Sequence, residues 1–173
     1  MTVIDELVLA NEAYARSFDH ADLPMPPARR VAILTCMDAR IVPYGALGIR
    51  EGDAHVIRNA GGRARDALRS VIISQRLLGT RELAVIHHTD CGMLTFNNRD
   101  LRARVQADLG RDTGEFDFLP FVDVDESVRE DIEFLEATQL LDPETLIRGF
   151  VYDVKSGRLR EVPVDADAES RAG

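Results

Sequence analysis

Two cysteines and one histidine are the side chains of this chain best suited to bind a transition metal. Cys36 and Cys91 are its only cysteines, and His88 lies just before the second. Thiolate sulfur and neutral imidazole nitrogen are ligands that zinc accepts together in a tetrahedral site. A structural zinc site usually closes all four positions with two close ligand pairs, whereas here one cysteine joins a single close pair. The pattern therefore favours a catalytic Zn²⁺ site with an open position, one per chain.

An aspartate and an arginine follow Cys36 at alternating positions, in the segment CMDAR. A guanidinium can hold a carboxylate by two parallel hydrogen bonds. We therefore expect Asp38 to have two states, one paired with Arg40 and one bound to the metal as a fourth ligand. In the paired state zinc keeps a water whose pKa falls toward about 7, which yields a hydroxide nucleophile near neutral pH.

Each of these residues also has a simpler interpretation. Lone cysteines at strand ends are usually small buried hydrophobic side chains. An aspartate and an arginine two positions apart often form a surface ion pair that contributes little to stability. A redox pair of Cys36 and Cys91 is a third interpretation, but it leaves His88 unexplained. The metal site is favoured because both cysteines fall at predicted strand ends and because Asp38 and Arg40 accompany the first.

The elements that would position these residues follow from the hydrophobic pattern. Short apolar runs alternate with segments whose apolar residues follow helical spacing. This pattern predicts an α/β fold with a central, largely parallel β-sheet flanked by helices. Cys36 and His88 each end an apolar run, and the carboxyl ends of parallel strands meet at one edge of a sheet. We expect strands within residues 29–36, 55–62, 82–92 and 142–154, a hairpin return in 155–162, and helices over 3–18, 65–78 and 123–141, the second stopping at Gly79.

The length of 173 residues suits one domain, which we expect over residues 1–163, with a flexible tail over 164–173. Prolines between positions 24 and 27 interrupt the chain after the first helix. We therefore expect helix 3–18 to pack away from its own chain start, on a partner subunit.

The charge and the apolar pattern exclude several classes of partner. A formal net charge of −9 would repel phosphate backbones, so we expect no nucleic-acid partner. No stretch is apolar over the roughly 18 to 20 residues that a membrane span needs, and the start lacks a signal-peptide pattern. Two thiols without an export signal should stay reduced. We therefore expect a cytoplasmic protein without a membrane partner.

The segments CMDAR (36–40) and HTDC (88–91) resemble the signature of the β-class carbonic anhydrases, Cys-x-Asp-x-Arg followed later by His-x-x-Cys. The resemblance covers about residues 30 to 160 and is closest to short actinobacterial members, through HHTDCGMLTF. It implies zinc on both cysteines and His88, and a homodimer or homotetramer.

The same resemblance implies the reaction and the roles of the site residues. Zinc-bound hydroxide would convert carbon dioxide reversibly to bicarbonate and a proton. Asp38 would orient the hydroxide, with Arg40 as its partner in a catalytic gate. The backbone N–H of Gly92 would bind a substrate oxygen.

Two other functions fit the same motifs. Carbonyl sulfide and carbon disulfide are also linear, uncharged and apolar, so a hydrolase acting on either would need the same metal site. A non-enzymatic zinc protein, serving as a sensor or assembly module, would have Asp38 permanently on the metal. The presence of Arg40 argues against that closed site, which needs no partner to draw the carboxylate away.

Four neighbouring residues are expected to be structural. Strand alternation points His87 to the face opposite His88. Asp90 is placed to cap a short helix that begins near Cys91. Arg63 and Arg65 follow the turn NAGG, and we expect them to be solvated at the start of a helix.

Overall fold

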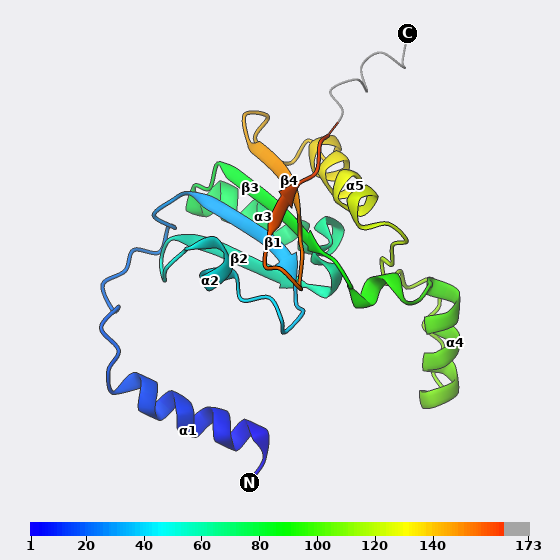
Figure 1. Cartoon of the computed structure of the whole chain (residues 1–173), viewed down its shortest axis with the longest axis horizontal. Coiled ribbons are helices and arrows are strands. Elements are labelled where there is room, and N and C mark those ends of the chain that lie inside the picture. The colour runs from blue at the N-terminus through cyan, green and yellow to red at the C-terminus, as the bar shows by residue number, and fades with distance from the viewer. Residues whose placement is uncertain (165–173) are drawn as a thin grey trace.

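In the computed structural model, which describes residues 1–164, five strands form one sheet in the order β2-β1-β3-β4-β5 (Figure 1). The first four strands are parallel to their neighbours, and only β5 pairs antiparallel with β4. The predicted α/β fold with a largely parallel sheet is confirmed. The strands are β1 (Val31–Cys36), β2 (Ala54–Asn59), β3 (Glu82–His88), β4 (Leu146–Tyr152) and β5 (Leu159–Glu161). All but the first residue of the predicted tail, 164–173, lies outside the described residues.

Five α-helices and two short 3-10 turns connect the strands of the described chain. The helices are α1 (Val3–Ala15), α2 (Pro43–Leu47), α3 (Ala64–Leu78), α4 (Asn98–Leu109) and α5 (Val124–Ala137), and the 3-10 turns are η1 (Ala60–Gly62) and η2 (Gly92–Leu94). Three helices were predicted, although α1 and α5 both end earlier than their patterns indicated. The helix stop at Gly79 is confirmed, because this glycine has a left-handed conformation with φ 73° after the last turn of α3.

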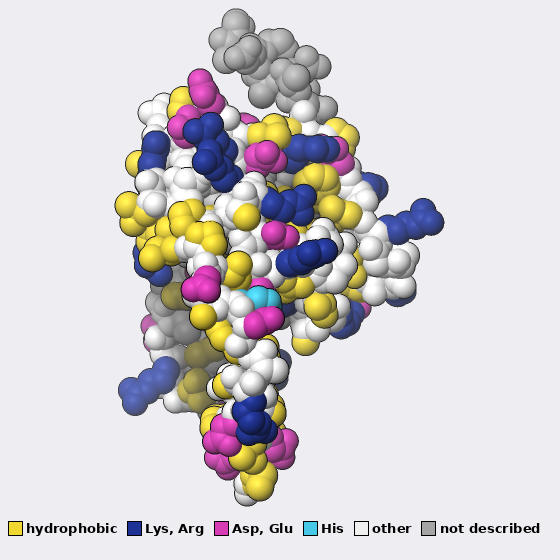
Figure 2. All heavy atoms as spheres, turned by 90° about the vertical axis from the view of Figure 1, so that its left-hand side faces the viewer, with side chains coloured by type: hydrophobic (Ala, Val, Ile, Leu, Met, Phe, Trp, Pro, Cys, Tyr) yellow, Lys and Arg dark blue, Asp and Glu magenta, His cyan; other side chains and the backbone are white. Residues whose placement is uncertain are grey.

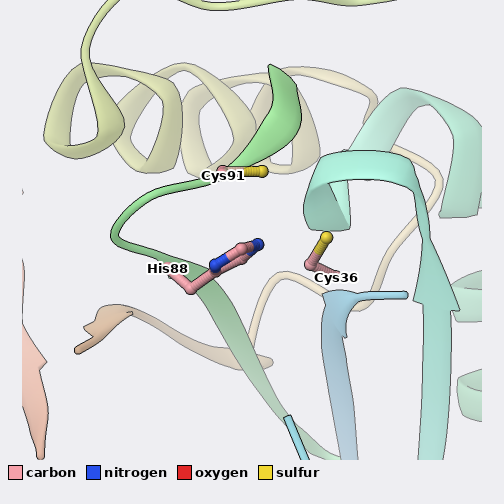
Figure 3. Close-up of side chains that lie close together, drawn as sticks. All are labelled: Cys36, His88 and Cys91. Atoms are coloured by element: carbon pink, nitrogen blue, oxygen red, sulfur yellow. The ribbon is translucent and has the colours of Figure 1, made fainter. Parts of the chain in front are cut away.

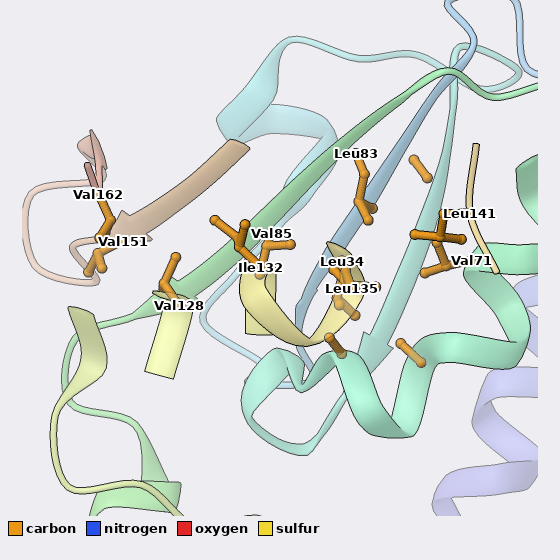
Figure 4. Close-up of a cluster of buried hydrophobic side chains, with 13 residues drawn as sticks. Leu34, Val71, Leu83, Val85, Val128, Ile132, Leu135, Leu141, Val151 and Val162 are labelled. Atoms are coloured by element: carbon orange, nitrogen blue, oxygen red, sulfur yellow. The ribbon is translucent and has the colours of Figure 1, made fainter. Parts of the chain in front are cut away.

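The main core lies between the sheet and the helices α3 and α5, which cover one face of it (Figures 1 and 4). Leu34 of β1 and Val85 of β3 point to this face, where they join Val71 of α3 and Ile132 of α5. Alternate residues such as Ile33 point to the opposite face and form a second cluster. Both faces of the central strands are therefore buried, which explains their continuous apolar sequences.

The order of the strands brings two separate parts of the sequence to one edge of the sheet. Strands β1 and β3 are adjacent and parallel, with Thr35 opposite Ile86. Cys36 and His88 are the last residues of these two strands, as predicted. Their side chains therefore begin from neighbouring points at the carboxyl edge of the sheet.

Helices α1 and α4 project from this sheet-containing body (Figure 1). Neither helix has a buried residue. Helix α1 is nevertheless well defined at its start, because Thr2 and Asp5 exchange hydrogen bonds in a capping box. Among the described residues, no helix is both long enough and apolar enough to cross a membrane.

A glycine in β4 permits the close packing of α5 on the sheet. A β-carbon added at Gly149 would overlap Val128 Cγ1 and lie 2.7 Å from Ile132 Cδ1. We therefore expect Gly149→Ala to lower the free energy of unfolding by about 1–3 kcal/mol, the usual result of overpacking a core. Urea unfolding followed by circular dichroism measures the change.

The matched control is Gly45→Ala in α2, where an added β-carbon meets no atom within 4 Å. This substitution should leave stability unchanged or raise it by up to about 1 kcal/mol, because alanine favours helix more than glycine does. Equal stability of the two variants would contradict this account of the packing at Gly149.

Candidate metal centre

Three side chains converge at the carboxyl edge of the sheet. One ligand atom each from Cys36, His88 and Cys91 lies within 4.8 Å of the other two. Figure 3 shows the two sulfurs and the imidazole ring facing one another, from the ends of β1 and β3 and from the loop that follows β3. All three residues are buried. The sequence-predicted ligand set is therefore assembled in space.

The imidazole of His88 is oriented for binding a metal through one nitrogen. Its Nδ1 lies 2.9 Å from the carbonyl oxygen of Thr89, which makes Nδ1 the donor and leaves a lone pair on Nε2. Nε2 is buried and has no hydrogen-bond partner among the described residues. Buried polar atoms nearly always have a partner, and a metal ion would supply one here.

The two sulfurs are close enough to alter each other's ionisation. Interaction with the Cys91 side chain is the largest cause that lowers the pKa of Cys36 to about 4, and burial opposes it. The same contact, together with burial, raises the pKa of Cys91. A bound Zn²⁺ would favour the thiolate form of both cysteines, because zinc binds thiolate sulfur. Two sulfurs and one imidazole nitrogen fit zinc, with a fourth tetrahedral position left for another ligand.

The turn NAGG packs directly against the first ligand segment. A β-carbon at Gly62 would lie 3.1 Å from the backbone nitrogen of Cys36 and 3.2 Å from Thr35 Cα. Gly62 also has φ 73°, which side-chain-bearing residues rarely adopt. Only glycine therefore fits at this position without moving the segment that carries Cys36.

The predicted pair of Asp38 and Arg40 is present. Arg40 Nε donates to Asp38 Oδ1 at 3.0 Å, and Nη2 donates to Oδ2 at 2.7 Å. The Arg40 side chain is the largest cause that holds the pKa of Asp38 well below its usual range. Asp38 Oδ2 lies 3.9 Å from His88 Nε2, so the charged carboxylate stands beside the ligand set while Arg40 holds it.

Asp90 has a different role from the predicted helix cap, and that prediction is wrong. Cys91 occupies the cap position of η2, and no side chain makes a capping hydrogen bond there. Asp90 instead accepts a hydrogen bond from Arg40 Nη1 at 2.7 Å through its carboxylate, and one from Nη2 at 2.9 Å through its backbone oxygen. The arginine therefore bridges the two motifs.

The expected structural role of His87 agrees with its contacts. His87 Nδ1 lies 2.6 Å from Ser127 Oγ, and Nε2 lies 3.1 Å from Asp131 Oδ2. Both partners belong to α5, on the face opposite to the ligand cluster. Asp131 also accepts a hydrogen bond from the backbone N–H of Ala64, the first residue of α3. This fully buried group joins β3 to the starts of two helices.

The expectation of solvated arginines after NAGG is wrong for Arg63 and right for Arg65. The Arg63 side chain is only 6% exposed, pairs with Glu130 at 3.0 Å and lies over the ring of Phe121. Arg65 is exposed and lies over the ring of Phe134. Arg63 is buried because α5 brings the carboxylates of Glu130 and Asp131 to it, while Phe121, just before α5, covers its guanidinium.

Gly92 and Arg58 also lie in or near the site. Gly92 is the first residue of η2, directly after Cys91, and its carbonyl oxygen accepts a hydrogen bond from Thr95. Its contact with substrate stays a prediction.

Arg58 was not identified from the sequence, although it donates to the backbone oxygens of Cys36 and Asp38 at 3.0 and 2.7 Å. Its place in the predicted strand within residues 55–62 was the only signal.

An α/β sheet that presents a Cys-His-Cys ligand set beside a carboxylate-guanidinium pair defines a candidate zinc enzyme. Comparisons with known proteins specify the class. The carbonic anhydrase family model matches residues 31–111. Beta-carbonic anhydrase 1 of Mycobacterium tuberculosis is 48% identical over 164 residues, covering 94% of this chain and 99% of the relative.

Two further similarities describe the range of the relatives. The crystal structure of a carbonic anhydrase from Streptococcus mutans is 49% identical, with a TM-score of 0.90 over 94% of this chain and 99% of that one. Carbon disulfide hydrolase of Acidianus is 35% identical over 161 residues, covering 79% of each chain. The chain belongs to the β-carbonic anhydrase family.

Zinc binding by the three side chains can be tested by replacing them singly. We expect Cys91→Ser and His88→Gln to weaken zinc binding by more than about 100-fold, because even the loss of an outer partner costs about 10- to 100-fold. Competition with a chromophoric chelator measures the affinity. His20→Gln, a histidine outside the cluster, is the matched control and should bind zinc as the parent protein does. Unchanged affinity in Cys91→Ser would remove this cysteine from the ligand set.

Proposed function

We propose that this chain catalyses the reversible hydration of carbon dioxide to bicarbonate and a proton, with one zinc ion held by Cys36, His88 and Cys91. The observation that carries the proposal is the convergence of three ligand atoms beside a carboxylate that Arg40 holds off them. Bound by these three side chains, zinc would lower the pKa of a coordinated water to about 7 and so would supply a nucleophile near neutral pH. The 48% identity to a beta-carbonic anhydrase supports this reaction.

The residues of the chain would orient the reactants. Asp38 is held charged by Arg40 and can accept a hydrogen bond from a water or hydroxide next to His88 Nε2, which would direct its lone pair toward the substrate. Gly92 would donate its backbone N–H to a substrate oxygen. Buried apolar side chains pack beside the two cysteines, which suits a small uncharged substrate; they are Ile41, Met93 and Phe121.

Carbonyl sulfide or carbon disulfide is the second candidate substrate. Its support is the similarity to carbon disulfide hydrolases, one of them 35% identical. The higher identity to a beta-carbonic anhydrase favours carbon dioxide. A permanently closed, non-enzymatic zinc site is disfavoured because Arg40 holds Asp38 by two side-chain hydrogen bonds.

We further propose that the protein forms a homodimer or homotetramer in the cytoplasm. The apolar side chains of α1 remain exposed in the single chain, Ile4 at 71% and Leu7 at 64%. Figure 2 shows hydrophobic side chains along the projecting N-terminal segment at the bottom of the view. Tyr14 and His20 both contact Glu51, so the base of this segment is attached to the body while α1 extends away from it. A second copy of the chain would cover this surface.

The proposed location in the cytoplasm is supported by the two free, buried thiols, which suit a reducing compartment.

The role of the dyad can be tested with Arg40→Ala. Without its guanidinium partner, Asp38 should move toward the metal ligands. We expect kcat/KM for carbon dioxide to fall roughly 100-fold, as misplacement of a reacting group commonly costs, while zinc content stays at one per chain. Stopped-flow hydration on protein of measured zinc content tests this.

The matched control for Arg40→Ala is Arg148→Ala. Arg148 is about as exposed as Arg40 and also pairs with a carboxylate, that of Glu161, but it lies on β4 outside the two motifs. The control should keep parental activity. Parental activity in Arg40→Ala would contradict the dyad, and faster turnover of carbon disulfide than carbon dioxide by the unmodified protein would favour the second substrate.

The assembly through α1 can be tested by charging its apolar surface. We expect the double substitution Ile4→Asp and Leu7→Asp to shift the protein toward monomer in analytical ultracentrifugation, because burying two carboxylates without partners is costly. Glu6→Gln with Glu12→Gln alters charge on the same helix and should leave the assembly intact. An unchanged mass of the aspartate variant would exclude α1 from the interface.

A further inference from the structure

We propose that Asp90 is a positioning residue that anchors Arg40 and thereby keeps Asp38 away from the metal ligands; this inference rests on the function proposed above. The dyad in this structure is in fact a three-residue group, because Arg40 contacts carboxylates from both motifs. Asp38 takes Nε and Nη2 of the guanidinium, and Asp90 takes Nη1 with its side chain. The backbone oxygen of Asp90 accepts a further bond from Nη2.

The guanidinium of Arg40 shares its N–H donors between two acceptor residues, Asp38 and Asp90. Charge-assisted bonds from an arginine fork fix orientation as well as distance. With Asp90 bound to Nη1 and Nη2, the guanidinium cannot rotate freely or follow Asp38 toward the cysteines. Asp38 therefore has to leave three hydrogen bonds from Arg40 behind, one of them from its backbone N–H, before it can reach the metal ligands. In this way Asp90 stabilises the state in which the fourth position is open.

Asp90 itself is held by the sheet and not by the arginine alone. The preceding residue, Thr89, donates its backbone N–H to the Tyr152 oxygen at 3.0 Å, and its hydroxyl accepts from the Val154 N–H at 3.1 Å. Asp90 has φ 55°, a left-handed conformation that aspartate tolerates better than most residues. This conformation directs both its carboxylate and its carbonyl oxygen to Arg40, so the anchor is continuous with β4.

The backbone of the first motif is fixed separately. Arg58 binds the carbonyl oxygens of Cys36 and Asp38, which holds the main chain on either side of Met37. Movement of Asp38 toward the metal would therefore be a rotation of its side chain. Whether Asp38 stays on Arg40 or moves to the metal then depends on how firmly Arg40 is held. Asp90 is the residue outside the first motif that holds Arg40 in position.

The test measures access to the fourth position directly, apart from activity. Asp90→Gly removes the carboxylate and keeps the left-handed backbone without strain. In the cobalt(II)-substituted protein, azide can bind only where Asp38 does not occupy the metal. We expect the dissociation constant for azide, followed by visible absorption, to rise at least about tenfold, equivalent to about 1.4 kcal/mol. A crystal structure of the zinc-loaded variant should show Asp38 oriented toward the metal ligands.

Two further variants make the result specific. Asp90→Asn restores a hydrogen-bond acceptor at the same place and should recover most of the azide affinity. Glu161→Gln, which removes an exposed carboxylate from another arginine, Arg148, should bind azide as the parent protein does. Parental azide affinity in Asp90→Gly with Asp38 still on Arg40, or no recovery in Asp90→Asn, would overturn the proposal. Azide affinity and the position of Asp38 do not depend on which substrate the enzyme uses. A failure to hydrate carbon dioxide would therefore be a separate result, which counts against the proposed function and not against the role of Asp90.

Discussion

Parallel pairing of β1 with β3 is the constraint on which the metal centre depends. Two strands that run in the same direction, with Thr35 opposite Ile86, deliver Cys36 and His88 to one edge of the sheet. A shift of either strand by one residue would turn its last side chain to the opposite face. The buried side chains that fix this register therefore also fix the separation of two candidate ligands. Cys91 needs no third strand, because the short turn after His88 brings it back to the same place.

Polar contacts on both sides of this edge of the sheet hold the groups that surround the ligand cluster in place. Arg58 holds the main chain of the first motif, and Arg40 holds the carboxylate of Asp38. On the other side of β3, His87 bonds to Ser127 and Asp131 inside the core. Buried polar groups that are fully paired favour one arrangement over others. The candidate metal site thus lies between the exposed arginine contacts of the first motif and the buried contacts of His87.

Much of this arrangement could be predicted from the sequence because it depends on local patterns. Continuous apolar runs identified the strands, and the positions of Cys36 and His88 at their ends indicated a shared edge. Helix α4 was missed because most of its residues, NRDLRARVQADL, are polar and its few apolar residues give only a weak helical pattern. The contact of Asp90 with Arg40 joins positions 50 residues apart and uses a left-handed backbone that no spacing rule reveals. The burial of Arg63 likewise depends on Glu130, far along the chain.

We propose that Cys36, His88 and Cys91 together bind one zinc ion through two sulfurs and His88 Nε2. Anomalous diffraction at the zinc absorption edge, on crystals of the protein purified with zinc, tests it most directly. We expect one peak per chain, about 2.3 Å from each sulfur and about 2.0–2.1 Å from Nε2. A zinc-replete crystal without a peak between these atoms, or one in which the two sulfurs are bonded to each other, would contradict it.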